Sequence, residues 1–333
     1  MRQYITYILG LALMATACDN ENISDLPQAD SAVSFQVRTV LPGGEEGEPQ
    51  SAERMTRLFV AERPQEHTEP LHCAPEMRFT LTDNIYNLSG LYGQWYKFAF
   101  ISVPQWENGG GENLFTEENP EEKTCDFTKL LVDFSPVLEY QKNNPGMVYS
   151  KDLHIYRKNI DRWIHPDEPS VEDVEMKRIT GELIIDMGKP ADQFEMPVNK
   201  IRLILNNPNK QVYVRDEANA EVITTKGSSS DFIYELPVSL DSNSQYQRQY
   251  LILTLLPEEL NGKIIVYHEG TNEVDDFKIG GDKGFPISIK PNVRTTVLFN
   301  GMDKDQFEVR YAGFNDGDDA VIDVPDNGWN GWQ

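Results

Sequence analysis

Alternation of apolar and polar side chains with a period of two residues constrains the fold of this chain more than any other feature. In residues 177–187 (KRITGELIIDM) most of the apolar side chains fall on one face and most of the charged ones on the other. In residues 94–103 (QWYKFAFISV) both faces are mostly apolar, which is typical of a strand buried between two layers. A period of two indicates β-strands, because successive side chains point to opposite faces. The apolar face of the first segment comprises Ile179, Gly181, Leu183, Ile185 and Met187.

The same pattern recurs in short segments that are separated by turn residues such as NNPN (206–209) and GGDKG (280–284). Helical periodicity is nearly absent. Only residues 127–142 could hold a helix, and Pro136 is expected to interrupt it. We therefore predict an all-β chain of the sandwich type. The further strand candidates are residues 33–37, 57–62, 78–82, 200–206, 211–215, 232–240, 249–256, 262–268 and 293–299.

A change in composition near the middle divides the chain into two parts. Residues 165–175 (HPDEPSVEDVE) contain two prolines and five acidic side chains, and a strong strand pattern follows them. We interpret this segment as a boundary. It separates an N-terminal β-sandwich at 31–164 from a C-terminal one at 176–314, each of ordinary domain size. The polar residues 315–333 form a C-terminal tail that is not expected to fold alone.

Residues 1–17 have the pattern of a signal peptide. The apolar run from Ile5 to Met14 is too short to cross a bilayer, which takes about 20 residues. Small residues at 15–17 stand directly before Cys18 and look like a lipobox, at which a peptidase cuts on the amino side of a lipidated cysteine. We predict lipidation of Cys18; the alternative is a plain signal peptide with a chance cysteine.

An acidic tether at 18–30 follows the predicted lipidation site. Its sequence is short of apolar residues, so one interpretation is a flexible link between the lipid and the first domain. The other is a sorting signal, because acidic residues directly after a lipidated cysteine resemble surface-export signals of some gut and oral anaerobes. With either interpretation of the tether, we expect a lipid-anchored protein of the cell outer membrane.

The net charge of the chain excludes one class of partner. It carries 54 acidic against 30 basic side chains and a formal charge of −24. Such a chain repels phosphate backbones and anionic lipid surfaces, so we expect no binding to nucleic acid.

Two cysteines remain once Cys18 is assigned to the lipid. Cys73 and Cys125 could form one disulfide in an oxidising compartment, which would stabilise the fold. The alternative is a pair of buried thiols, and the sequence leaves both open.

Patterns that indicate catalysis or metal binding are absent from the sequence. His67, His72 and Cys73 lie close together, but their spacing fits no familiar zinc arrangement. The acidic residues 315–328 could offer oxygen ligands to a hard cation. They lack the mid-loop glycine and the terminal glutamate of an EF-hand calcium-binding loop. No nucleophile elbow, Walker loop or dinucleotide motif is present. We predict a protein that is not an enzyme, with no catalytic residue, metal site or cofactor.

Three segments carry a resemblance to a known family. They are LSGLYGQWYKFAFISVP (88–104), KRITGELIID (177–186) and FPISIKPNVRTTVLFNG (285–301). Together with the lipobox and the acidic tether, they resemble the fimbrillin-like superfamily of type V pili, and most nearly its FimB-type fimbrial anchor lipoproteins. The resemblance implies two tandem transthyretin-like β-sandwich domains. It also implies partner subunits joined by strand exchange, in which an extended segment of one subunit completes the sheet of the next.

The resemblance leaves open whether the chain is an anchor or a shaft subunit. Shaft precursors of the family lose a segment after an arginine, whereas anchors stay uncut at the base of the fimbria. Arg38, Arg54 and Arg57 lie in the region where such a protease could act.

The C-terminal tail contains a candidate donor strand. Ala320, Ile322 and Val324 point one way in a short alternating run, and Trp329 and Trp332 could fill pockets of a partner. The alternative is a strand that folds back onto its own domain.

A rival hypothesis comes from another class of protein. Surface glycan-binding lipoproteins of polysaccharide-uptake systems also combine a lipidated cysteine, an acidic tether and β-sandwiches, and they stack sugars on exposed aromatic rings. The candidate rings here are Trp106, Trp163, Trp329 and Trp332. Neither class identifies a host or glycan ligand from the sequence.

Overall fold

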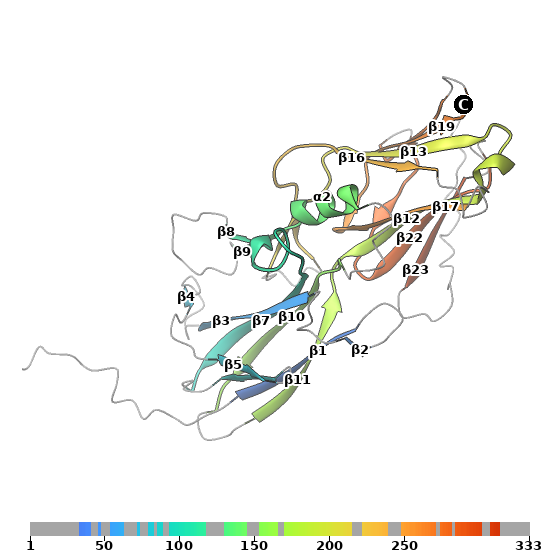
Figure 1. Cartoon of the computed structure of the whole chain (residues 1–333). Coiled ribbons are helices and arrows are strands. Elements are labelled where there is room, and N and C mark those ends of the chain that lie inside the picture. Colours follow the sequence, from blue (N-terminus) through green and yellow to red (C-terminus); the bar gives the residue numbers. More distant parts are fainter. Residues whose placement is uncertain are drawn as a thin grey trace, which may run out of the picture.

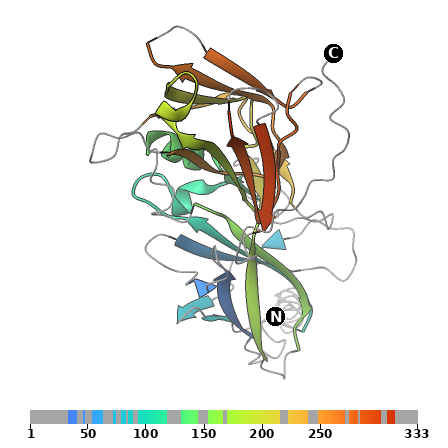
Figure 2. The same ribbon diagram turned by 90° about the vertical axis from the view of Figure 1, so that its right-hand side faces the viewer.

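The computed structural model of the chain (Figure 1) consists of two β-rich halves arranged end to end. Figure 2 shows the blue and cyan strands of the first half below the yellow and orange-red strands of the second. The structure describes residues 33–40, 46–47, 54–62, 72–73, 79–82, 85–88, 93–117, 130–144, 153–165, 170–214, 222–238, 248–270, 274–281, 284–301 and 307–313.

The first half is built from strands in the order β4-β3-β7-β10-β11-β1-β6-β5, with β2 paired to β1. β10 and β11 are paired only at Tyr156–Arg178 and Arg157–Lys177, so the sheet bends there into two facing layers. The strands are β1 (Val33–Val40), β2 (Glu46–Gly47), β3 (Arg54–Glu62), β4 (His72–Cys73), β5 (Phe79–Thr82), β6 (Ile85–Leu88), β7 (Trp95–Pro104), β10 (Tyr156–Trp163) and β11 (Ser170–Arg178).

The second half is a pair of four-stranded sheets, β17-β12-β22-β23 and β16-β13-β19-β20. Buried side chains of the two sheets, such as Ile185, Leu203 and Phe299, share one core, so the sheets pack face to face. The strands are β12 (Gly181–Pro190), β13 (Val198–Leu205), β16 (Phe232–Pro237), β17 (Arg248–Leu255), β19 (Gly262–His268), β20 (Val274–Ile279), β22 (Val293–Phe299) and β23 (Phe307–Gly313), with a small ladder of β18 (Glu258–Glu259) and β21 (Ser288–Ile289) beside them.

Strand pairing in the two halves follows one scheme. β1 lies between β6, which is antiparallel to it, and β11, which is parallel. β12 lies in the same way between antiparallel β17 and parallel β22. In the other layer, the order β4-β3-β7-β10 matches the order β16-β13-β19-β20. In each half, therefore, the first strand is parallel to a strand near the C-terminal end of that half: β1 to β11, and β12 to β22.

A third sheet joins the halves. It has the order β15-β14-β9-β8, and its strands come from both sides of residue 165. Helix α2 (Ser135–Asn143) follows β9 and packs on β16 and β17. The remaining elements are η2 (Gly111–Leu114), β8 (Phe115–Glu117), β9 (Leu130–Asp133), β14 (Gln211–Tyr213), β15 (Thr224–Thr225) and the single turn η4 (Ala191–Gln193).

The predicted strand between two layers is confirmed in β7. Tyr96, Phe98 and Phe100 point into the core of the first half. Ala99 and Ile101 point the other way, into the core that the second half shares with Leu114, Val132 and Leu153. This double burial explains why both faces of the segment are apolar.

The all-β class predicted from the sequence is confirmed, and two details differ. Pro136 does not interrupt a helix, because it occupies the first turn of α2, where its missing N–H has no helical partner to lose. Residues 170–175 of the predicted boundary lie in β11, where they pair with β1. The apolar side chains Val174 and Met176 of β11 are buried in the core of the first half, while most of its acidic side chains lie on the other face. The division into 31–164 and 176–314 stays a prediction.

Within the described residues, no helix is both long and apolar enough to span a bilayer.

Candidate functional site

The candidate site is β1, the first strand of the described part of the chain, with the strands around it. Seven residues of β1, Val33 to Thr39, pair in parallel with Ser170 to Met176 of β11. On its other side, four residues pair with β6. Three side chains, Val33, Phe35 and Val37, are at most 2% exposed, so β1 is an integral part of the core.

The ring of Phe35 fixes the position of β1 along its neighbours. Its centroid lies 4.8 Å from that of Phe98 and 5.2 Å from that of Phe100, both on β7 in the opposite layer. A shift of β1 by one residue would turn Phe35 toward solvent, because side chains alternate between faces. The register of β1 is therefore strongly specified.

The three arginines that could direct proteolysis all lie within strands. Arg38 is on β1 and forms an ion pair of 3.2 Å with Glu175 of β11. Arg57 is on β3, forms an ion pair of 2.5 Å with Glu112 and lies 5.4 Å above the ring of Phe115. A protease binds an extended, unpaired segment, so the folded chain does not present these bonds.

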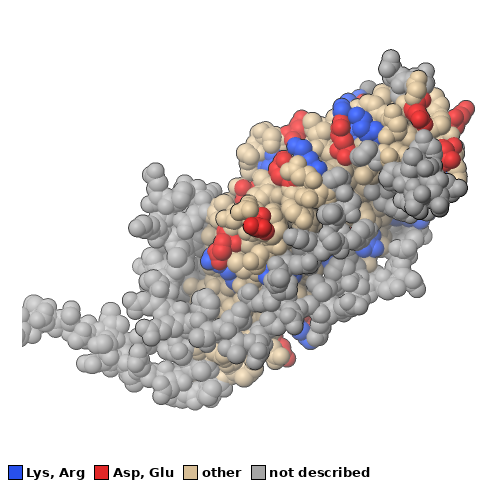
Figure 3. Space-filling view, viewed as in Figure 1, with Lys and Arg blue, Asp and Glu red and all other residues tan. Residues whose placement is uncertain are grey.

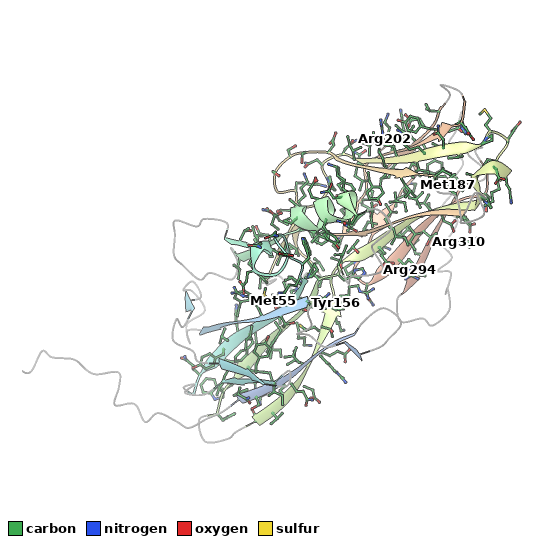
Figure 4. The ribbon with its side chains drawn as sticks, viewed as in Figure 1. Met55, Tyr156, Met187, Arg202, Arg294 and Arg310 are labelled. Carbon is green, nitrogen blue, oxygen red and sulfur yellow. The ribbon has the colours of Figure 1, made fainter. Side chains whose placement is uncertain are left out.

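Arg54 is the most enclosed of the three, with 3% exposure. Its Nη2 donates hydrogen bonds to the carbonyl oxygens of Ser102 (3.0 Å) and His154 (2.9 Å). Its guanidinium lies 4.5 Å from the ring centroid of Tyr156, which is labelled in Figure 4 next to Met55. From Thr39 to Glu53, between Arg38 and Arg54, the sequence has no lysine or arginine.

A buried polar network links the two halves near Arg54. The Nδ1 atom of His154, just before β10, lies 2.8 Å from Oγ1 of Thr180, which directly precedes β12. Its Nε2 atom lies 3.4 Å from Oε1 of Glu182 on β12. Arg294 of β22 donates from Nε to Oε2 of the same carboxylate over 2.9 Å, and Figure 4 shows it at this end of the second half.

The pKa of Glu182 reflects two opposing causes. Burial raises the pKa of this carboxyl group, but the hydrogen bonds and charges of His154 and Arg294 outweigh burial and hold the pKa below its usual range. The ionised form is thus stabilised by the fold. The network draws on His154 from the first half and on β12 and β22 from the second, so it favours a fixed connection between the halves.

Two edge strands of the second half, β16 and β23, carry charged side chains. On the outer face of β13 and β16, Arg202 pairs with Glu235 and lies 5.3 Å from the ring of Tyr267. On β23, Arg310 forms an ion pair of 2.8 Å with Glu308. Figure 3 shows acidic and basic side chains interspersed over this half. Charged side chains on edge strands oppose uncontrolled pairing with other chains.

An aromatic pair lies at the same end of the first half as Val33, the first residue of β1. Trp95 and Trp163 are cross-strand partners on β7 and β10, with centroids 6.2 Å apart and planes at 80°. Trp95 is 41% exposed. The sequence analysis named Trp163 as a candidate ring but not Trp95. Both faces of residues 94–103 are apolar, and this pattern does not show that Trp95, at one end of the strand, is exposed to solvent.

Trp106, another ring named from the sequence, is not an open platform. It packs against Tyr140 with centroids 4.8 Å apart. A β-carbon added at Gly109 would clash with its Nε1 atom, so this glycine lies directly against the indole. Trp106 therefore holds a turn against α2.

Several predicted site residues lie outside the described residues. They are Cys18, Cys125, Ala320, Ile322, Val324, Trp329 and Trp332, and of Cys73 only the backbone, in β4, is described. The predicted lipidation, disulfide and donor strand therefore stay predictions.

Two histidines within the described residues have acceptor or carboxylate partners. His154 belongs to the network above, and Nε2 of His268 lies 2.7 Å from Oδ2 of Asp275. Among the described residues, no group of three histidine, cysteine, aspartate or glutamate side chains is arranged to hold a metal ion.

No protein-family model and no curated protein sequence matches the chain. Solved structures that resemble it include a fimbrial assembly protein from Parabacteroides distasonis, with a TM-score of 0.41, 10% identity and coverage of 86% of this chain and 97% of that one. Another is the tip fimbrial protein Mfa3 from Porphyromonas gingivalis with C-terminal truncation (TM-score 0.40, 10% identity, 85% and 98% covered). A third is a proposed polysaccharide-binding protein from Bacteroides thetaiotaomicron (TM-score 0.48, 8% identity, 86% and 96% covered).

Two of these three are fimbrial proteins, the kind that the sequence resemblance names.

Proposed function

We propose that this protein is a lipid-anchored subunit of a fimbria and serves as its anchor at the outer membrane. It would join other fimbrial subunits by strand exchange and so support cell adhesion. Each half would be a transthyretin-like sandwich, which the repeated scheme of strand pairing supports. The lipobox at Cys18 supplies the membrane attachment in this proposal.

One observation carries the choice of anchor over shaft. β1 is paired on both sides, and the three candidate arginines lie in strands with partners of their own. A cut after any of them would separate the lipid from most of the fold. A chain that resists the cut keeps a continuous covalent route from Cys18 through β1 into both cores, which is what an anchor requires.

The natural amino terminus of the surface protein tests this choice. Mass spectrometry of protein purified from outer membranes should find a lipidated Cys18 as the first residue. A terminus at Thr39, Met55 or Leu58 would show cleavage after an arginine and would refute the anchor role. In the matched Cys18→Ala variant, the protein should move to soluble fractions.

Strand exchange needs a separate experiment, because its candidate segment is the C-terminal tail. Deleting residues 316–333 should abolish SDS-resistant ladders that contain this protein and other fimbrial subunits. If the ladders persist in the deletion variant, the tail is not the donor. Shearing fimbriae from cells provides the control: an anchor remains with the membrane, whereas a shaft subunit leaves with the filament.

A second candidate function is favoured by one observation, the exposure of Trp95 beside Trp163. Flat rings with this exposure can stack on sugar faces, as in a glycan-binding lipoprotein of a polysaccharide-uptake system. Binding to a panel of polysaccharides that is lost in Trp95→Ala and retained in Val274→Ala would support it. Val274 is a suitable control because it is 47% exposed at a different edge.

A further inference from the structure

Tension on an anchor would enter the fold through β1. The tether joins β1 at Val33, and β11 passes into the second half through two residues, Ile179 and Thr180. The pairing of Val33 with Ser170 places the beginnings of β1 and β11 at the same end of the first half. A pull between the membrane and the second half therefore acts on opposite ends of two neighbouring parallel strands.

The direction of this pull determines how the pair can fail. The membrane draws β1 toward its beginning, and the second half draws β11 toward its end at Arg178. Both forces run along the strands in opposite senses, so the seven registered pairs are loaded together as β1 slides past β11. A pull on two ends at the same side would instead open the pairs one after another.

Side chains oppose the sliding movement as well. Phe35 is 0% exposed and sits against Phe98 and Phe100, so any displacement along the strand removes its ring contacts. Arg38 and Glu175 form an ion pair across the same two strands. The other neighbour of β1, the strand β6, adds four further residue pairs that sliding must break.

The end of β11 is held at the junction. The guanidinium Nη2 of Arg178 donates to the hydroxyl of Tyr156 over 3.2 Å, and the amide of Ile179 donates to the carbonyl of Ile155 over 2.9 Å. Arg178 and Lys177 also pair with β10. Force that arrives from the second half is therefore delivered to a strand end that is fixed to the rest of the sandwich.

We propose that the β1–β11 pair is a mechanical clamp that resists tension between the tether and the second half by loading its residue pairs in shear. This property goes beyond the anchor role, which would supply the tension in the cell. The clamp itself is a property of the folded chain and can be measured without a fimbria.

Single-molecule pulling on the mature chain with Cys18→Ala tests the clamp. One handle is attached to the amino terminus, and the other to an azide side chain introduced at position 177 or 171. Both positions lie on β11 and are exposed, Val171 with 73% of its surface. A handle at 171 loads the beginning of the strand, and a handle at 177 loads its end. We expect the unfolding force to be at least about twofold higher with the handle at 177, because parallel pairs then break together.

Equal forces in the two geometries, or a higher force with the handle at 171, would overturn the proposal. Phe35→Leu provides a second measurement: it should lower the force with the handle at 177 more than with the handle at 171. Failure of the clamp and failure of the anchor role are distinguishable. The pulling experiment uses the isolated chain, whereas the anchor role depends on the lipidated amino terminus found in native membranes.

Discussion

Gln141 of α2 caps the backbone of Thr254 on the edge strand β17 with two hydrogen bonds. Its Nε2 atom donates to the carbonyl oxygen over 3.0 Å, and its Oε1 atom accepts from the amide over 2.6 Å. The side-chain amide thus offers the same donor and acceptor as a neighbouring strand would. This arrangement covers part of an edge that could otherwise pair with another chain.

Replacing Gln141 with alanine should destabilise the protein. The change leaves a buried amide and a buried carbonyl without these partners, which costs about 1–3 kcal/mol. Urea unfolding would measure the loss, and hydrogen exchange at Thr254 should become faster. Lys142→Ala is the matched control, because Lys142 is exposed on the same helix and its ion pair with Glu139 is at the surface. An equal loss in both variants would contradict the capping role.

Glu182 should make stability depend on pH in the acid range. Its pKa is lowered in the folded state, so its contribution is fully present above the unfolded pKa near 4.5 and is lost as pH falls through the lower, folded pKa. Glu182→Gln should therefore be less stable than the parent at pH 7, by about 1–3 kcal/mol. The difference should shrink in thermal unfolding as the pH falls below 4.5. A difference that stays constant with pH would show that ionisation of Glu182 is not the cause.

An arginine-specific protease should spare the folded chain at three bonds. Cleavage after Arg38, Arg54 and Arg57 should be slow, because each lies in a paired strand. Peptide mass spectrometry after brief digestion should recover the segments across these bonds intact, and digestion in urea should cut them. Rapid cleavage after Arg38 in the native protein would mean that β1 leaves its sheet readily.

Phe35 should contribute much more to stability than Val171, although both lie in the paired region of β1 and β11. Phe35→Ala removes a ring that is 0% exposed and should cost about 3–5 kcal/mol. Val171→Ala trims a side chain that is 73% exposed and should change stability by less than about 0.5 kcal/mol. Chemical unfolding of the two variants compares them directly. Similar losses would place Phe35 outside the core.

The sequence alone predicted a large part of this fold. Residues 262–268 and 293–299 were predicted as strands and form β19 and β22 with the same bounds. The two apolar faces of residues 94–103 indicated a strand between layers, and β7 is one. These predictions succeed because period-two patterning is a local signal that burial imposes on each strand separately.

Other features depended on contacts between distant residues. No local pattern shows that β1 lies parallel to β11, since their paired residues are 137 positions apart, as Arg38 and Glu175 are. The capping of Thr254 by Gln141 joins residues 113 positions apart. The exposure of Trp95 depends on which segments cover the end of a sheet.

The sequence by itself determined that the chain is built from strands and roughly where they lie, whereas lipidation of Cys18 stays a prediction. Only the tertiary structure decided which strands are neighbours, in which direction they run, and that the arginines of the amino-terminal region lie within paired strands. The physical reason is that alternation encodes which face of a strand is buried, whereas pairing and direction result from the packing of whole layers.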